Sequence, residues 1–171
     1  MRKIILGLGI SLDGYIARKN GAVDWLSMNW DYDWTAFFKT IDAVLMGRKS
    51  WEVALEMTAP EKRSSNPYGA METYVFSNTL KTSGVDGVEI VSGDLKKFVE
   101  MLRAKDGKNL WLSGGGSLAK SFLDENLVAT GILASGFADE IRKRHGEEKT
   151  CPPCPHCGGD ISEVARINSA D

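Results

Sequence analysis

The 171-residue chain has no cysteine before residue 151, and its three cysteines, Cys151, Cys154 and Cys157, share one short window. An odd number of crowded cysteines does not make a disulfide framework.

No apolar run approaches the roughly 18 to 20 residues that would cross a bilayer. The apolar run after Arg2 and Lys3 is short and lacks a cleavage pattern, so we expect no signal peptide, no membrane partner and a cytoplasmic location.

An excess of charge of either sign is also lacking. The chain has 21 basic and 23 acidic residues, which gives a formal net charge of −2. This balance gives no electrostatic reason to expect nucleic acid or an anionic membrane as a partner. Two common nucleotide-binding motifs, the G-x-G-x-x-G fingerprint and the P-loop, are missing as well. What remains is a chain of one-domain size with an ordinary apolar fraction of 43%.

Short apolar runs alternate with amphipathic segments along the first 128 residues. The first run is nearly continuous, as in a strand buried on both faces of a helix-covered parallel sheet. The predicted strands are 4–10, 43–46, 74–76, 88–91 and 110–113, and helices are expected from Ser50, from Asp94 and after Ser117. Residues 58–72 are predicted to form a loop. This alternation predicts an α/β fold with ligands at the carboxyl ends of the strands.

Two strand-to-helix turns have an arrangement that suits phosphate. The first turn is Gly47-Arg48-Lys49-Ser50, and the second turn is Gly114-Gly115-Gly116-Ser117. A strand that ends in glycine and opens into a helix presents backbone N–H groups at a positive dipole end. The adjacent cations Arg48 and Lys49 suit a phosphate monoester, such as the 2′-phosphate that distinguishes NADPH from NADH. The alternative is an ordinary tight turn in each case, with Ser50 or Ser117 as the helix N-cap.

Aromatic residues and acids crowd the stretch between residues 24 and 38. Its aromatic residues are Trp25, Trp30, Tyr32, Trp34, Phe37 and Phe38. We favour core packing for Phe37 and Phe38, although an apolar wall with a few carboxylates also suits a planar heterocycle. Asp13 follows the first predicted strand and is the candidate catalytic residue, because it should lie near the ligand edge of the sheet. Its alternative role is to open an Asp-Gly turn.

Four segments occur in a distinctive order. They are 10–17 (ISLDGYIA), 46–52 (MGRKSWE), 75–80 (VFSNTL) and 111–116 (WLSGGG). This series resembles the bacterial dihydrofolate reductase-like family that includes the riboflavin-biosynthesis reductase (RibD C-terminal) domain. The resemblance covers residues 1 to about 128 and implies a three-layer αβα fold with a mainly parallel sheet.

The same resemblance implies an enzyme that uses NADPH. It assigns the cofactor's phosphates to the first and second turns, its adenosine end to the segment with Ser77 and Asn78, and the nicotinamide and substrate pocket to the segment with Asp13. The implied reaction is hydride transfer to a pterin- or pyrimidine-like heterocycle, similar to that of 5-amino-6-(5-phosphoribosylamino)uracil reductase. The alternative is a non-catalytic, truncated reductase scaffold or a zinc-binding interaction module.

The sequence departs from the family after Val128. We therefore divide the chain into a reductase-like domain (1–128), an atypical connecting segment (129–150) and a Cys/His-containing tail (151–171). The family's further strands are missing or replaced, which would leave strand 4–10 as a long apolar edge. Residues 129–145 could cover that edge, a partner chain could cover it in a homodimer, or the chain could be a truncated or frameshifted product.

The tail has a pattern of its own. Cys151, Cys154 and Cys157 resemble half of a zinc ribbon, and a closed zinc site would need a fourth ligand such as His145 or His156. The alternative, which we favour, is a flexible Pro- and Gly-rich tail with free thiols.

Overall fold

The computed structural model describes residues 1–11, 15–23 and 34–134. The chain divides into two compact units, residues 1–7 with 34–130 and residues 8–33 with 131–171. The site discussed below belongs to the first unit. Within the described ranges, no helix has both the length and the apolar character needed to cross a membrane.

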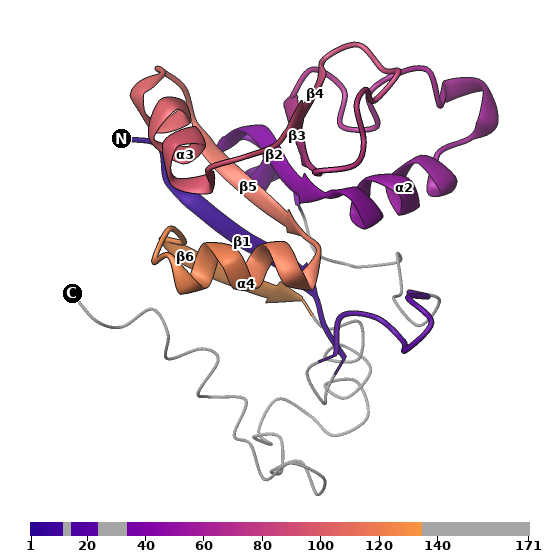
Figure 1. Cartoon of the computed structure of the whole chain (residues 1–171), viewed down its shortest axis with the longest axis horizontal. Helices are drawn as coiled ribbons and strands as arrows, with labels where there is room; N and C mark the ends of the chain where they lie inside the picture. Colours follow the sequence, from indigo (N-terminus) through magenta and orange to yellow (C-terminus); the bar gives the residue numbers. More distant parts are fainter. Residues whose placement is uncertain (12–14, 24–33, 135–171) are drawn as a thin grey trace, which may run out of the picture. The chain divides into compact units, whose positions relative to one another are not determined.

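Six strands form one sheet in the order β4-β3-β2-β5-β1-β6 (Figure 1). They are β1 (Ile4–Gly9), β2 (Ile41–Gly47), β3 (Glu72–Phe76), β4 (Val88–Val91), β5 (Asn109–Gly114) and β6 (Thr130–Ala134). The helices are α1 (Thr35–Phe38), α2 (Arg48–Met57), α3 (Leu95–Ala104) and α4 (Gly116–Asp124), with a short 3₁₀ turn η1 (Pro60–Lys62). The pairs β1–β5, β2–β5, β2–β3 and β3–β4 are all parallel, which confirms the predicted α/β fold.

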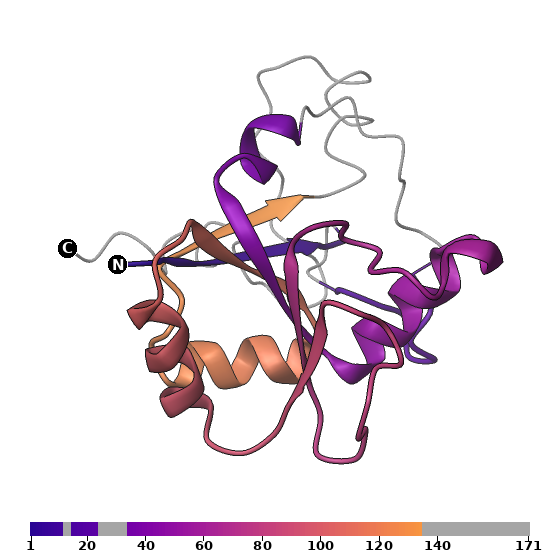
Figure 2. The same cartoon turned by 90° about the horizontal axis from the view of Figure 1, so that it is seen from above.

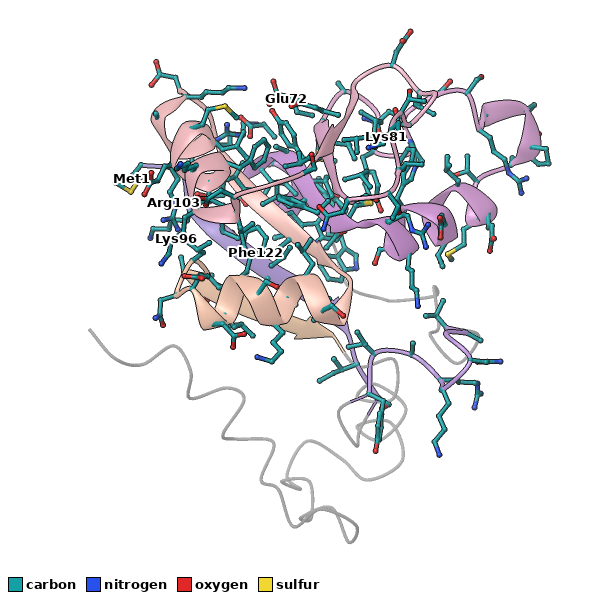
Figure 3. The ribbon with its side chains drawn as sticks, in the orientation of Figure 1. Met1, Glu72, Lys81, Lys96, Arg103 and Phe122 are labelled. Carbon is teal, nitrogen blue, oxygen red and sulfur yellow. The ribbon has the colours of Figure 1, made fainter. Side chains whose placement is uncertain are left out.

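Helices cover both faces of the sheet, as a buried parallel sheet requires. On one face, Trp51 of α2 packs with Val44 and Met46 of β2. On the other face, the Phe76 ring contacts Phe98 of α3 and Phe122 of α4, at centroid distances of 5.5 and 5.7 Å. Figure 2 shows α1 on one side of the strands and α3 and α4 on the other. Phe122, labelled in Figure 3, points from α4 toward the sheet and is fully buried.

Strand β6 follows directly after the segment in which the sequence departs from the expected pattern. The N–H of Ala129 donates to the carbonyl of Ile4 over 2.9 Å, and β6 is the neighbour of β1 in the sheet. Among the three alternatives for the missing strands, the structure supports cover by the segment that begins at residue 129. Strand β1 is therefore an inner strand, because β5 and β6 flank it.

The pairing of β2 with β5 contains two β-bulges. Near the amino ends, Ile41 pairs with Asn109 and Ala43 with Leu110, so Asp42 is the extra residue on β2. Near the carboxyl ends, Leu45 pairs with Leu112 and Met46 with Gly114, so the extra residue is on β5. Bulges are rare in parallel pairs and commonly redirect a side chain.

The first bulge anchors the amino end of the sheet. The Asp42 carboxylate accepts hydrogen bonds from the Arg2 guanidinium and from the N–H of Lys108, the latter over 2.8 Å. The Nε of Arg2 donates in turn to the carbonyl of Lys108 over 2.7 Å. The Arg2 side chain is only 4% exposed, so its charge depends on these partners.

Candidate cofactor-binding site

The first and second turns touch each other. Strands β2 and β5 are parallel neighbours with Met46 opposite Gly114, so both turns begin at the same edge of the sheet. A Cβ atom on Gly115 would lie 3.5 Å from the Oγ of Ser50 and 3.6 Å from the Cα of Gly47. The sequence predicts the two turns separately, and the strand pairing brings them together.

Both helices that leave these turns begin without a side-chain cap. The N-cap residues are Gly47 for α2 and Gly115 for α4, and neither helix has an acidic residue in its first turn. The expectation that Ser50 and Ser117 are the N-caps is therefore wrong, although an ordinary tight turn without a ligand stays an alternative. Each helix begins earlier, at Arg48 or Gly116, because a glycine takes the extended or positive-φ conformation at the N-cap.

Two uncapped helix starts in contact form an arrangement that would suit an anion. The first N–H groups of a helix have no partner within the helix, and the aligned peptide dipoles make that end positive. Gly114 and Gly115 have φ values of +137° and +88°, which side chains rarely tolerate. Glycine thus leaves the backbone open to a ligand at this point.

Two cations lie at the start of α2. Arg48 and Lys49 are exposed, and the Nε of Arg48 is 3.6 Å from the Oε1 of Glu52. Both partners of that pair are almost half exposed, so the pair is weak and the Arg48 side chain can exchange Glu52 for a phosphate. Lys49 forms no ion pair with any residue in the described ranges.

The loop after β3 follows the strand beside the first turn. Phe76 pairs with Gly47, so Ser77 and Asn78 come directly after the carboxyl end of β3. The Oγ of Ser77 accepts hydrogen bonds from the N–H groups of Leu80 and Thr79, over 2.9 and 3.2 Å. The Ser77 hydroxyl oxygen therefore shapes this loop, whereas Asn78 is exposed.

Several predicted site residues lie outside the described residues. They are the candidate catalytic residue Asp13, the aromatic residues Trp25, Trp30 and Tyr32, and the candidate zinc ligands Cys151, Cys154 and Cys157. Ser11 and Tyr15, which flank Asp13 in the sequence, are hydrogen-bonded to each other. Among the described residues, no group of three His, Cys, Asp or Glu side chains could hold a metal ion.

An aromatic cluster packs beside β5. The Trp111 ring contacts Phe37 and Phe38 at centroid distances of 5.7 Å each, and its Nε1 donates to the carbonyl of Gly7 over 3.2 Å. A Cβ atom on Gly7 would lie 2.6 Å from that nitrogen, so the indole requires glycine there. Phe37 is buried, which confirms its predicted packing role; Phe38 joins the cluster but keeps 39% of its surface exposed.

Two further residues near this cluster, Tyr68 and Ser113, could not be singled out from the sequence. Tyr68 lies in the predicted loop 58–72, yet its ring packs against Trp111 at 5.9 Å. Burial raises the pKa of the Tyr68 phenol, and a hydrogen bond with the Ser113 side chain lowers it in part. The one local signal was an aromatic residue between Pro67 and Gly69, which does not by itself show where the ring points.

Comparison of the sequence with models of protein families shows the family to which the chain belongs. The model of the RibD C-terminal domain matches residues 2–135, which is most of the chain. The protein therefore belongs to the RibD C-terminal domain family. The match extends through β6, beyond the end of the resemblance seen in the sequence motifs.

Two individual proteins and one solved structure are also similar to this chain. YyaP, an uncharacterised protein of Bacillus subtilis, is 37% identical over 134 residues, which span 74% of this chain and 70% of YyaP. YwjB of the same organism, also uncharacterised, is 29% identical over 135 residues, covering 77% of this chain and 75% of YwjB. A crystal structure described as a "Putative riboflavin biosynthesis protein" from Shewanella sp. PV-4 matches with a TM-score of 0.63 and 29% identity, over 78% of this chain and 76% of that one.

Proposed function

We propose that this protein is an NADPH-dependent reductase that transfers hydride to a pterin- or pyrimidine-like heterocycle. The carrying observation is the contact between the first and second turns, where Gly115 lies against Ser50 and two uncapped helices begin. Membership of the RibD C-terminal domain family supports a reductase-like activity. A reaction similar to that of 5-amino-6-(5-phosphoribosylamino)uracil reductase is the specific form of this proposal.

The residues present fit the phosphates of NADPH. The open backbone at Gly114 and Gly115 and the N–H groups that begin α2 and α4 suit a pyrophosphate. Arg48 and Lys49 would bind the 2′-phosphate, since guanidinium and ammonium groups form charge-assisted hydrogen bonds with phosphate oxygens. The loop that Ser77 shapes would lie at the adenosine end.

The protein's part in such a reaction is to position the reactants. Bound NADPH would supply the hydride, and the chain would hold cofactor and substrate in reacting geometry. Asp13 or a water molecule would move the accompanying proton. The aromatic cluster around Trp111 would provide an apolar wall beside β5.

Titration with NADPH tests this proposal directly. Trp111 and Trp51 are both at least partly buried near the two turns, so cofactor binding should quench tryptophan fluorescence. We expect saturable quenching at micromolar NADPH and much weaker binding of NADH. Absence of binding at millimolar NADPH, in a sample shown to be folded by circular dichroism, would contradict the proposal.

The remaining expectations stay predictions from the sequence. Size-exclusion chromatography tests the homodimer. Metal analysis of the purified full chain tests zinc in the cysteine tail, where about one equivalent would support the zinc-binding alternative and none would contradict it.

A further inference from the structure

We propose that Trp111 is a positioning residue, whose indole N–H holds the carbonyl of Gly7 and so shapes the end of β1 toward which the nicotinamide half of NADPH extends. This inference rests on the proposed reductase function. Three observations carry it: the order of the strands, the hydrogen bond between Trp111 and Gly7, and the aromatic packing that holds the indole.

The order of the strands sets the direction in which a bound dinucleotide extends. The first turn follows β2 and the second turn follows β5, and β1 lies on the side of β5 away from β2 (Figure 1). Arg48 and Lys49, which suit the 2′-phosphate of the adenosine half, begin α2 on the β2 side. With its pyrophosphate between the two turns, NADPH would therefore extend its nicotinamide half toward β1. Neighbouring strands lie about 4.8 Å apart, so one strand spacing is within reach of the nicotinamide ribose and ring.

The hydrogen bond between Trp111 and Gly7 lies where the regular pairing of two strands ends. The register of β1 against β5 ends with Leu6 opposite Leu112, and Gly7 is the next residue of β1. The Nε1 of Trp111 donates to the carbonyl of Gly7 over 3.2 Å. A side chain of β5 thus holds the backbone of β1 just beyond the paired residues.

The lack of a side chain at Gly7 lets the indole reach this backbone. A Cβ atom on Gly7 would lie 2.6 Å from the Nε1 of Trp111 and 3.2 Å from its Cδ1, so any other residue would displace the ring. Gly7 is also buried, and a buried carbonyl needs a hydrogen-bond donor from the protein or from an ordered water molecule. The indole N–H supplies that donor.

Three aromatic rings hold the indole in place. Phe37, Phe38 and Tyr68 contact Trp111 at centroid distances of 5.7, 5.7 and 5.9 Å, with interplanar angles of 89°, 65° and 83°. Edge-to-face contacts of this kind favour one orientation of the ring. The N–H is therefore directed at Gly7 before any ligand binds, and such preorganisation lowers the entropic cost of binding.

A donor that holds Gly7 acts on one half of the cofactor. Removal of the N–H would leave the buried carbonyl of Gly7 without this partner, and the backbone of β1 would relax there. The phosphates are assigned to the turns after β2 and β5, and these turns do not contain Gly7. We therefore expect Trp111 to affect the binding of NADPH and to have little effect on a ligand that lacks the nicotinamide ring.

Two ligands separate these halves. NADPH carries the reduced nicotinamide ring, whereas 2′-phospho-ADP-ribose has the same pyrophosphate and 2′-phosphate without the ring. Isothermal titration calorimetry of the full chain gives both dissociation constants and does not depend on tryptophan fluorescence. We expect the wild-type protein to bind NADPH more tightly than 2′-phospho-ADP-ribose by about tenfold.

The variant Trp111→Phe should reduce this preference. Phenylalanine keeps an aromatic ring beside Phe37 and Phe38 but has no N–H donor, and the melting temperature checks that the variant folds. NADPH affinity should fall about five- to tenfold, while the affinity for 2′-phospho-ADP-ribose changes less than about twofold. Gly7→Ala, which displaces the indole from the other side, should lower the same ratio.

NMR of the wild-type protein tests the hydrogen bond without any substitution in the protein measured. Each tryptophan gives one indole N–H signal in a proton–nitrogen spectrum, and the signal of Trp111 is the one missing from the spectrum of Trp111→Phe. We expect this N–H to exchange slowly with solvent, because it is hydrogen-bonded to a buried carbonyl. Exchange as fast as that of a free indole would overturn the inference.

Trp51→Phe is the matched control. Trp51 belongs to α2, which begins at the first turn, and it packs against Val44 and Met46 of β2. Any loss of affinity in this variant should be equal for the two ligands, because both carry the phosphates, so the ratio should stay unchanged. An unchanged ratio in Trp111→Phe, or an equal fall of the ratio in Trp51→Phe, would overturn the inference alone. A wild-type protein that binds NADPH no more tightly than 2′-phospho-ADP-ribose would do the same, whereas one that binds neither ligand would overturn the proposed function with it.

Discussion

The Oγ of Ser50 lies 3.5 Å from the place that a Cβ atom would occupy on Gly115. Ser50 belongs to the first turn of α2, and Gly115 is the N-cap of α4. The contact means that two helices from different strand-to-helix units begin side by side, each with first N–H groups that have no partner within the helix. A single helix start binds an anion weakly, whereas two starts in contact suit the two adjacent phosphates of a dinucleotide.

Gly115→Ala should weaken NADPH binding and destabilise the fold. The backbone of Gly115 has a φ of +88°, where a non-glycine residue costs roughly 1–3 kcal/mol. We expect a lower melting temperature and at least about a tenfold loss of NADPH affinity, since relaxation of the strain would move the N–H groups of α4. Gly93→Ala is the control, because Gly93 has a φ of +99° with nothing near its Cβ position. It should destabilise the protein similarly and leave NADPH affinity intact; equal affinity losses in both variants would contradict the role of Gly115.

Arg48→Ala should weaken binding of NADPH far more than binding of NADH. A hydrogen bond from a charged group contributes about 1.5–3 kcal/mol, so the NADPH dissociation constant should rise about tenfold or more. Stability should hardly change, because the Arg48–Glu52 pair is exposed. Glu52→Ala removes the same ion pair without removing the cation, and it should leave NADPH affinity unchanged or slightly improved. Equal losses for both cofactors in Arg48→Ala would disprove the 2′-phosphate assignment.

Asp42→Ala should lower the free energy of unfolding by about 2–3 kcal/mol, measured by urea denaturation. The reason is that the buried Arg2 guanidinium and the N–H of Lys108 would lose their shared acceptor. Asp124→Ala removes the exposed pair with Lys120 and should cost less than about 1 kcal/mol. Similar losses for the two variants would show that the first bulge does not anchor the sheet.

Stability should fall at high pH because of Tyr68 and Tyr74. Burial raises the pKa of both phenols above the ordinary value of 10.0, and for Tyr74 the neighbouring Glu72 carboxylate raises it further. The unfolded chain therefore releases these protons first, so the stabilisation is complete below pH 10.0 and is lost as the pH rises toward the folded-state pKa values. Urea denaturation from pH 8 to 11 measures the slope. Replacing both tyrosines with phenylalanine should flatten it, and an unchanged slope would refute this explanation.

Much of the fold could be predicted from local patterns. Apolar runs predict the strands β1, β2 and β5, and glycines predict the turns after β2 and β5, because these signals lie in residues that are adjacent in the sequence. Asp94 caps α3 as expected, and its side chain accepts a hydrogen bond from the N–H of Lys97. The helix starts are predicted less accurately. Ser50 and Ser117 are good N-cap residues in isolation, but Gly47 and Gly115 before them adopt the non-helical backbone conformation of the N-cap. Strand β6 was not predicted, since Thr130–Ala134 is a short apolar stretch that becomes a strand beside β1.

The sequence by itself determined the α/β class and the two turns suited to phosphate, because glycine placement and hydrophobic periodicity depend on adjacent residues. The resemblance to the family rested on the order of four short motifs. Only the tertiary structure decided that Ser50 meets Gly115, and that the Tyr68 ring packs against Trp111 of β5. These contacts join residues far apart in the chain. They depend on the order of the parallel strands and on a bulge in their register, which the packing of the whole sheet determines.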